Sequence, residues 1–265
     1  MYKKLQILDA GLLDTYKSNI KVDFDKELEV LSRVDTQFQK FDFYTSVSVV
    51  FSSKIEGEEI ELDSFLKHKA ELASYQPDYT RKIDDLYDGY QFAQKSKLNF
   101  LNVLDCHKII TRNILQVSRQ GTIRNGLMYV LTEDGKIEYV AANPEMVKTE
   151  IDKLFEDLDF LINEGLKVED VFYFASMLHL VFVKIHPFED GNGRMARLIE
   201  KWFIARKLGN SAWFIQSEKY YYRHHDQYYR NIRALGFEYE TLEYKNALPF
   251  LAMLPASLAE KQENN

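Results

Sequence analysis

The spacing of apolar residues along the chain predicts a mainly helical protein. Apolar side chains recur every three or four residues in several blocks, which is the period of an amphipathic helix. Residues 25–56 follow this pattern as one long or broken helix, with Gly57 placed to end it. Residues 167–185 are apolar on nearly every side, so we expect a central helix that is buried all round. The other expected helices cover residues 64–73, 80–97, 101–116, 144–163, 194–208 and 220–235.

One short region departs from the helical period. Residues 127–132 and 137–141 are rich in strand-forming residues, and they flank Glu133, Asp134 and Gly135, a stretch typical of a tight turn. We expect one β-hairpin that lies on the helices, because an isolated hairpin is only marginally stable. The predicted fold class is therefore all-α, a helical bundle with a single β-hairpin flap.

The composition fits a chain that folds without covalent cross-links. Of its 265 residues, 46% are apolar, and the single cysteine, Cys106, cannot form an intrachain disulfide. Only 11 Gly and 5 Pro are present, which predicts few turns and long helices. We divide the chain into an N-terminal helical region (1–97), a core domain (98–240) and a C-terminal extension and tail (241–265).

Charge and hydropathy narrow the range of partners. The net charge of −7 disfavours nucleic acid, and no segment approaches the roughly 20 apolar residues of a membrane span. The first residues lack the apolar run of a signal peptide, so we expect a cytoplasmic protein with no membrane partner. Residues 194–235 nevertheless carry nine Lys/Arg and three Asp/Glu, a basic island that indicates a local anion site.

The stretch His-Pro-Phe-Glu-Asp-Gly-Asn-Gly-Arg-Met-Ala-Arg, residues 186–197, carries the candidate chemistry. Two glycines lead into a helix whose first N–H groups favour an anion, and Arg194 and Arg197 share one face of that helix. Asp190 is a hard oxygen ligand suited to Mg2+, and His186 is a base that titrates near neutrality. This combination indicates phosphoryl or nucleotidyl transfer. It is neither a Walker loop nor an H-E-x-x-H zinc site.

This loop resembles the motif H-x-F-x-[DE]-G-N-G-R-x-x-R of the Fic (filamentation induced by cAMP) family at every specified position. The resemblance extends over about residues 45–235. Further shared features are Gly121 and Arg124 ahead of the hairpin, Pro144 after it, and the adjacent Tyr228 and Tyr229. It implies a helical fold with a hairpin flap and transfer of AMP from ATP to a Ser, Thr or Tyr hydroxyl of a target protein.

The resemblance also implies a role for each residue of the loop. His186 would take the proton of the target hydroxyl, Asp190 would hold Mg2+ against the phosphates, and Phe188 would anchor the loop inward. Arg194 would contact the β-phosphate and Arg197 the γ-phosphate. The implied anion hole consists of Asn192 and the N–H groups of Gly191, Gly193 and Arg194.

Two further sets of residues receive implied roles outside the loop. Tyr228 and Tyr229 would line the adenine pocket, although Leu235 and Gly236 stand near where the family often has an asparagine beyond that pair. Target binding falls to the flap, whose backbone would pair with the target chain through Met128, Tyr129, Val130 and Leu131.

An inhibitory element is implied upstream of the core domain. Ser52, Glu56 and Gly57 fit the pattern [ST]-x-x-x-E-[GN] of Fic proteins that an N-terminal helix inhibits. Glu56 would reach Arg197 and occupy the group needed for the γ-phosphate. By spacing alone, the same residues are also an ordinary helix end with a terminal glycine.

Two alternatives remain beside an autoinhibited protein adenylyltransferase. The same residues serve the reverse reaction, a de-AMPylating hydrolase in which Glu56 positions a water. The chain can also be a catalytically silent nucleotide-binding or interaction module. His107 and His179 are interpreted as hydrogen-bonded core residues, and the sequence leaves a homodimer open.

Overall fold

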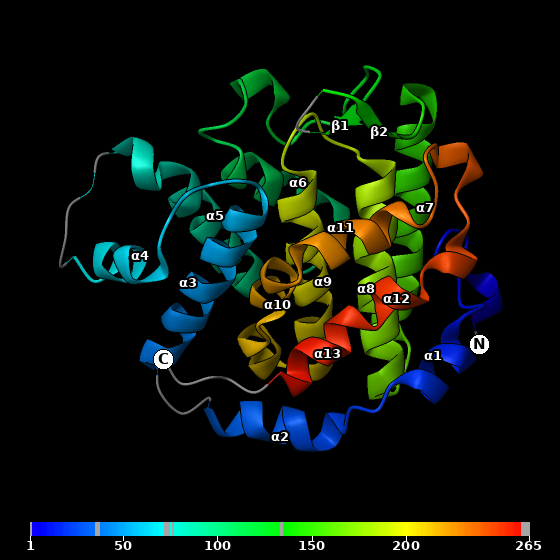
Figure 1. Ribbon diagram of the computed structural model, residues 1–265, viewed down its shortest axis with the longest axis horizontal. Helices are drawn as coiled ribbons and strands as arrows, with labels where there is room; N and C mark the ends of the chain where they lie inside the picture. The colour runs from blue at the N-terminus through cyan, green and yellow to red at the C-terminus, as the bar shows by residue number, and fades with distance from the viewer. Residues whose placement is uncertain (1, 35–37, 72–74, 76, 133–134, 261–265) are drawn as a thin grey trace.

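The computed structural model describes residues 2–34, 38–71, 75, 77–132 and 135–260. Over these residues the chain is mainly helical with one two-stranded sheet, as predicted (Figure 1). The strands are β1 (Tyr129–Leu131) and β2 (Ile137–Val140). The helices are α1 (Leu13–Asn19), α2 (Phe24–Val34), α3 (Phe38–Ile55), α4 (Leu62–Lys69), α5 (Pro77–Lys95), α6 (Phe100–Ile110), α7 (Pro144–Asn163), α8 (Val168–Ile185), α9 (Asn192–Leu208), α10 (Ser217–Arg223), α11 (His225–Arg233), α12 (Leu248–Leu251) and α13 (Met253–Ala259).

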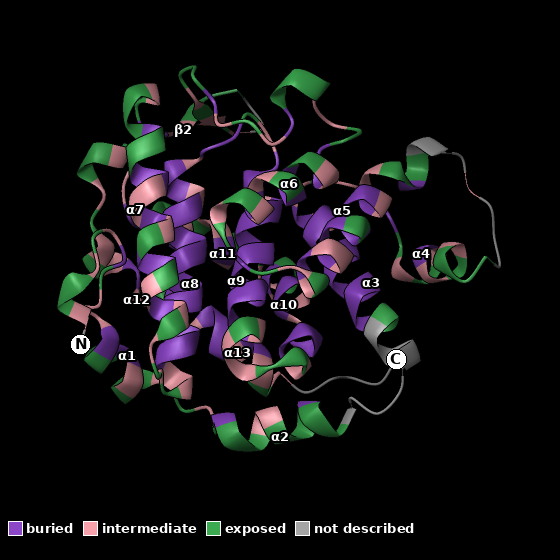
Figure 2. Cartoon of the chain, turned by 180° about the vertical axis from the view of Figure 1, so that it is seen from behind, coloured by how far each residue is buried: buried purple, intermediate pink, exposed green. Residues whose placement is uncertain are grey.

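Helices α8 and α9 pack against each other at the centre of the molecule (Figures 1 and 2). Helices α3, α5 and α6 also pack on α9, and α7 packs on both central helices. From Asp170 to Ile185 every residue of α8 except Val183 is buried. The prediction of a central helix without a water-facing side is therefore confirmed, because an all-round apolar surface must be covered on all sides.

Several predicted helices differ from the structure. The helix expected over residues 101–116 ends at Ile110 as α6, and the one expected over 64–73 ends at Lys69 as α4, with residues 72 and 73 outside the described residues. Residues 25–56 form α2 and α3, so the broken form of that prediction is the one found, and residues 35–37 lie outside the described residues. A single helix over residues 220–235 was wrong, since α10 and α11 are separated at His224. The ring of His224 stacks on Tyr220 at 4.2 Å, and its backbone has φ −111° and ψ 38°, away from helical values.

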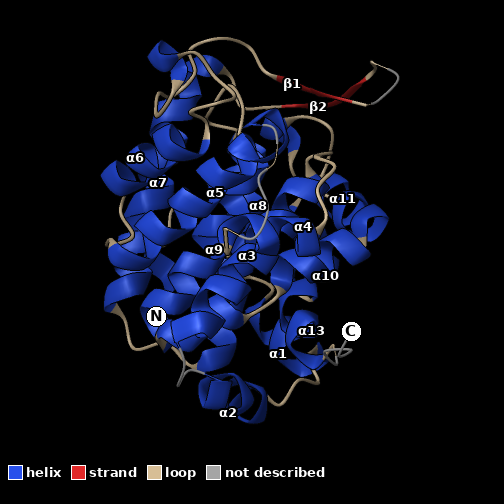
Figure 3. Cartoon of the chain, turned by 90° about the vertical axis from the view of Figure 1, so that its left-hand side faces the viewer, coloured by secondary structure: helices blue, strands red, loops and turns tan. Residues whose placement is uncertain are grey.

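The β-hairpin projects from one end of the helical body (Figure 3). Its strands are antiparallel, and the turn residues Glu133 and Asp134 lie outside the described residues. The Tyr139 hydroxyl donates to the carbonyl oxygen of Lys184 at 2.8 Å, and the Lys184 ammonium lies 3.9 Å from the centre of the Tyr139 ring. These contacts fix the base of the hairpin to the last turn of α8, next to the candidate loop.

The N-terminal segment is attached to α7 through the carboxylates of Asp157 and Glu156, the second of which accepts from the Gln6 side chain. Asp157 accepts hydrogen bonds from the backbone N–H groups of Gln6, Ile7 and Leu8 at 2.8–2.9 Å. One hydrophobic cluster includes residues from all three regions defined above, whose boundaries stay a prediction. No helix among the described residues is long and apolar enough to cross a membrane.

Candidate active site

Helix α8 ends at His186 in a left-handed backbone conformation. His186 has φ 54° and ψ 61°, a region that few residues other than glycine adopt because Cβ crowds the backbone. Arg124 holds this turn: its Nε donates to the His186 carbonyl oxygen and its Nη2 to that of Ala142, both at 2.6 Å. The backbone N–H of Arg124 donates to Pro187 at 2.9 Å. Arg124 therefore fixes the point at which the imidazole is presented.

The imidazole of His186 is arranged as a base. Its Nδ1 lies 3.1 Å from the carbonyl oxygen of Val183, which can only accept, so Nδ1 carries the hydrogen and Nε2 keeps its lone pair. Burial lowers the pKa of His186 to about 4. The charge of Arg124 also lowers this pKa, whereas the charges of Glu56 and Asp190 raise it. At neutral pH the ring is therefore uncharged and can accept a proton on Nε2.

His107 packs against the loop after His186 and binds its backbone. The rings of His107 and Phe188 are stacked, and both residues are buried. The His107 Nδ1 accepts the Gly121 N–H at 2.8 Å, so its Nε2 carries the hydrogen that it donates to the Asp190 carbonyl oxygen at 2.9 Å. The interpretation of His107 as a hydrogen-bonded core residue agrees with these contacts. The sequence did not show that it connects the Gly121 turn to the candidate loop.

The amide of Asn192 closes the loop on itself. Its side-chain oxygen accepts from the Phe188 N–H at 2.9 Å, and its nitrogen donates to the Phe188 carbonyl at 2.8 Å. What Asn192 offers an anion is therefore its backbone N–H. The hydrogen bond from the Met195 N–H to the Gly191 carbonyl opens α9, so the N–H groups of residues 192–194 lie ahead of it. A helix start of this kind favours negative charge.

Glycine is required at two positions of this cradle. Gly191 has φ 79°, and a Cβ there would lie 3.0 Å from Cγ2 of Thr111. A Cβ on Gly193 would lie 2.5 Å from Oε1 of Glu56 and 3.2 Å from Nη1 of Arg197. The carboxylate of Glu56 therefore occupies the space that the missing side chain of Gly193 leaves at the start of α9.

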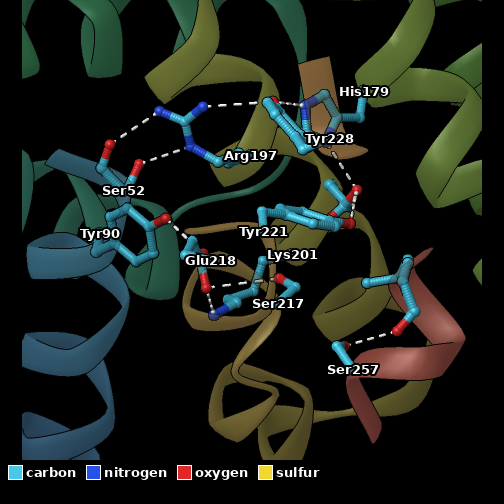
Figure 4. Close-up of polar contacts among 12 residues, drawn as sticks. Ser52, Tyr90, His179, Arg197, Lys201, Ser217, Glu218, Tyr221, Tyr228 and Ser257 are labelled. Atoms are coloured by element: carbon cyan, nitrogen blue, oxygen red, sulfur yellow. Dashed lines mark hydrogen bonds and ion pairs between the residues drawn. The ribbon is translucent and has the colours of Figure 1, made fainter. Parts of the chain in front are cut away.

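Arg197 is fully buried and joins α9 to the end of α3 (Figure 4). Its Nη2 donates to Oε1 of Glu56 at 2.6 Å and to the Ser52 carbonyl at 3.0 Å, while its Nε donates to the Ser52 hydroxyl at 2.9 Å. Burial raises the pKa of Glu56, but the charges of Arg197 and Arg194 outweigh it and the pKa is lowered overall. The ionised contact predicted between Glu56 and Arg197 is thus present.

Asp190 and Arg194 face each other across the first turn of α9. Their closest charged atoms, Asp190 Oδ1 and Arg194 Nη2, are 3.7 Å apart. The Arg194 side chain is nearly buried, and its Nε has no hydrogen-bond partner among the described residues. Those residues contain no cluster of three or more His, Cys, Asp or Glu arranged to hold a metal. A half-exposed single carboxylate such as Asp190 is what Mg2+ uses when phosphates and waters complete its shell.

The four predicted flap residues lie along the open edge of the hairpin. The Val140 N–H of β2 donates to the Phe237 carbonyl at 2.9 Å, so β2 lies between β1 and that segment. The outer edge of β1 faces no other strand among the described residues. Tyr129 and Leu131 are exposed, whereas Met128 and Val130 are partly buried.

The adjacent tyrosines of α11 diverge. Tyr228 is buried, and its hydroxyl lies 2.8 Å from Nε2 of His179 and 3.4 Å from Nη1 of Arg197. Tyr229 is partly exposed, and its hydroxyl lies 3.4 Å from the carbonyl oxygen of Ile55 at the end of α3. Their assignment to an adenine pocket stays a prediction, for which only the Tyr229 ring has accessible surface.

A buried ionic layer behind Arg197 was not anticipated from the sequence. The Lys201 ammonium donates to the Ser48 hydroxyl and to Oε2 of Glu218, both at 2.6 Å. Ser48 lies one turn before Ser52 on α3, and Lys201 lies one turn after Arg197 on α9. The matching four-residue spacings were the available signal, because residues four apart share a helix face.

Comparison with known proteins places this site in a family. Residues 97–204, which include α8, the loop and most of α9, match the model of the Fic/DOC family. A crystal structure of a Fic family protein from Desulfovibrio desulfuricans G20 has a TM-score of 0.71 at 16% identity, covering 94% of this chain and 72% of that chain. The chain therefore carries a Fic/DOC domain over residues 97–204.

Two curated relatives match this chain over only a small part of their own length. The protein adenylyltransferase fic-1 of Caenorhabditis briggsae is 36% identical over 105 residues, which is 40% of this chain and 19% of that protein. The ribonucleoside-diphosphate reductase small chain of Ostreid herpesvirus 1 is 30% identical over 122 residues, which is 44% of this chain and 20% of that protein. The chain spans about a fifth of the length of these relatives.

Proposed function

We propose that this protein transfers AMP from ATP to a hydroxyl of a protein side chain, and that Glu56 inhibits the transfer. The observation that carries the proposal is the position of the Glu56 carboxylate, which lies against Gly193 and 2.6 Å from Arg197. A carboxylate held by a helix start and a buried arginine supports a phosphate site at that point. The match to a protein named as an adenylyltransferase supports the reaction.

In the proposed reaction His186 acts as the general base. The target hydroxyl gives its proton to Nε2 of His186 while its oxygen attacks the α-phosphorus of ATP. A bond forms between that oxygen and the α-phosphorus, the bond from the α-phosphorus to the bridging oxygen breaks, and pyrophosphate leaves with the electron pair. The backbone N–H groups of residues 192–194 would offset the charge that develops on the α-phosphate oxygens, whereas the Gly191 N–H is held by the Asp190 side chain.

The remaining charged residues of the loop would hold the triphosphate. Arg194 is assigned to the β-phosphate, and its nearly buried Nε without a protein partner supports that assignment. Arg197 is assigned to the γ-phosphate. Asp190 would hold Mg2+ together with phosphate oxygens, and Mg2+ bound there would neutralise phosphate charge.

The target would approach along the open edge of β1. An extended target segment can add to this edge by backbone hydrogen bonds, which orients the segment without reading its sequence. The fixed base of the hairpin, through Tyr139 and Lys184, supports this role because it sets the distance from the flap to His186.

Inhibition follows from competition between two anions for one guanidinium. Glu56 is ionised at neutral pH, since its pKa is lowered, and it already takes one N–H of Arg197 and the space at Gly193. A γ-phosphate cannot reach the same atoms while the carboxylate stays. ATP bound without that contact would have its α-phosphate out of line for attack.

Labelling with ATP that carries ³²P at the α-phosphate tests both parts of the proposal. Glu56→Gly, incubated with host-cell extract, is expected to label a target or itself many-fold more than the unaltered protein. Glu61→Gly is the matched control, because Glu61 pairs with Lys54 at the surface and not with Arg197. Adding His186→Ala to Glu56→Gly is expected to abolish the label.

Other outcomes separate the alternatives. Equal labelling by the unaltered protein and Glu56→Gly would contradict inhibition. Release of AMP from a pre-labelled target by the unaltered protein, lost in Glu56→Gly, would replace transfer by the reverse reaction. ATP binding without either activity would leave a nucleotide-binding module.

A further inference from the structure

A row of buried hydrogen bonds leads from Arg197 into the core. The Tyr228 hydroxyl is 3.4 Å from Nη1 of Arg197 and 2.8 Å from Nε2 of His179 (Figure 4). Nδ1 of His179 lies 2.8 Å from Oε2 of Glu200, and the Tyr221 hydroxyl donates to the same carboxylate at 3.0 Å. All five side chains are buried, so each polar atom depends on these contacts.

The donors and acceptors in this row can be ordered in one direction. A carboxylate only accepts, so Nδ1 of His179 carries a hydrogen and donates it to Glu200. With its hydrogen on Nδ1, the ring accepts at Nε2, and among the described residues the Tyr228 hydroxyl supplies that hydrogen. A guanidinium only donates, so the Tyr228 oxygen accepts from Arg197. Glu200 thereby sets the tautomer of His179, and this tautomer directs the Tyr228 O–H toward Nε2. The Tyr228 oxygen is then free to accept from Nη1 of Arg197.

The nitrogen that this row holds is the one that faces the anion cradle. Nη1 of Arg197 lies 3.2 Å from the point at which a Cβ on Gly193 would stand. Ser52 holds Nε and Nη2 from the other side. If Glu56 withdraws, the hydrogen bonds of Arg197 with Ser52 and Tyr228 remain, so the plane of the guanidinium does not change. One N–H of Nη1 and one of Nη2 are then directed to the space that Glu56 has left.

We propose that Tyr228, His179 and Glu200 are positioning residues that hold Arg197 ready for the terminal phosphate of a nucleoside triphosphate, an inference that rests on the function proposed above. An arginine with a fixed plane binds a phosphate through two parallel N–H groups without first losing rotational freedom. The row therefore acts on the affinity for a ligand that has a γ-phosphate and leaves a ligand without one unaffected.

The test compares the affinities for ATP and ADP, measured by calorimetry with Mg2+ present. The parent is Glu56→Gly/His186→Ala, which removes the competing carboxylate and prevents turnover. In this parent Tyr228→Phe is expected to lower the affinity for ATP about tenfold and the affinity for ADP less than twofold. Tyr221→Phe is the matched control: it removes a buried phenol oxygen that contacts Glu200, but it leaves the contacts from Glu200 through His179 and Tyr228 to Arg197 in place, so both affinities should stay within twofold.

A second pair of variants tests His179 without changing a tyrosine. Asparagine places its amide near the Nδ1 position and reaches Glu200, whereas glutamine places its amide near the Nε2 position and reaches Tyr228. His179→Asn is therefore expected to weaken ATP selectively, and His179→Gln to restore the affinity to within about threefold of the parent. This pair also carries the test if Tyr228→Phe does not fold.

The outcomes distinguish this inference from the proposed function. Unchanged ATP preference in Tyr228→Phe and His179→Asn, or equal weakening of ATP and ADP, would overturn the positioning role alone. A parent that binds ATP no better than ADP would overturn both that role and the assignment of Arg197 to the γ-phosphate. Transfer of AMP is measured separately, by the labelling of Glu56→Gly.

Discussion

The ring of His107 lies flat on the ring of Phe188, with centroids 3.6 Å apart and planes 13° from parallel. The same imidazole accepts the Gly121 N–H and donates to the Asp190 carbonyl. It therefore connects three segments: α6, the turn before the hairpin and the loop that carries His186. A proton added at Nδ1 would remove the acceptor for Gly121, which agrees with a pKa that burial lowers to about 4.

His107 makes the protein less stable in acid. An unfolded histidine has a pKa near 6.5, so between about pH 6.5 and 4 the unfolded chain binds a proton that the folded protein does not. The contribution is full above pH 6.5 and declines below it, by up to roughly 3 kcal/mol. Urea unfolding of the natural protein and His107→Gln at pH 7, 5.5 and 4.5 measures it. The difference between the two should shrink as the pH falls, and a constant difference would contradict the prediction.

Gly193 and Glu56 should be energetically coupled. A methyl group at Gly193 would stand 2.5 Å from the Glu56 carboxylate, so Gly193→Ala must displace one of them. We expect Gly193→Ala to lower the unfolding free energy by about 1–3 kcal/mol in the natural protein and by much less in Glu56→Gly. Gly165→Ala is the control, because a Cβ there meets nothing within 4 Å. Equal losses in both backgrounds by chemical unfolding would show that the two residues are independent.

His186 should remain neutral well below the pH at which a free histidine protonates. Its pKa is lowered to about 4, and the Glu56 charge acts to raise it, so Glu56→Gly should lower it further. The imidazole resonance that disappears in His186→Ala identifies the group in NMR spectra. Its titration is expected near pH 4 in the nucleotide-free protein, and a midpoint near 6.5 would remove the argument that burial prepares this base.

Arg124 should tolerate no shortening to lysine. Its guanidinium donates to carbonyl groups of His186, Ala142 and Gly126, which a single ammonium cannot reach together. Arg124→Lys is expected to cost about 3 kcal/mol of unfolding free energy through carbonyls left without donors.

The same substitution at Arg119 provides the comparison. Arg119 pairs with Glu189 at the surface, and both side chains are well exposed. Such a pair contributes less than about 1 kcal/mol, so Arg119→Lys should unfold close to the natural protein. A similar cost for the two substitutions, measured in parallel by urea unfolding, would show that Arg124 does not hold the end of α8.

Much of the local structure was predictable because it depends on neighbours in the chain. The apolar run over residues 167–185 required a helix covered on all sides, and α8 is one. The glycines of the loop indicated a close backbone approach, and Gly193 leaves room for the Glu56 carboxylate. The hairpin followed from strand-forming residues on either side of a turn, although a helix over residues 220–235 did not allow for the break at His224.

The sequence by itself determined the helical fold class, the hairpin and the residues of the loop, since periodicity and motif spacing act over a few residues. Only the tertiary structure decided which nitrogen of His186 keeps a lone pair, that His107 supports the loop, and that Tyr228 turns into the core beside His179. The last two facts depend on contacts between segments far apart in the chain, whereas the His186 nitrogen is set by the Val183 carbonyl in the turn that Arg124 holds. The packing of α6, α8, α9 and α11 sets the distant contacts, and local spacing does not encode it.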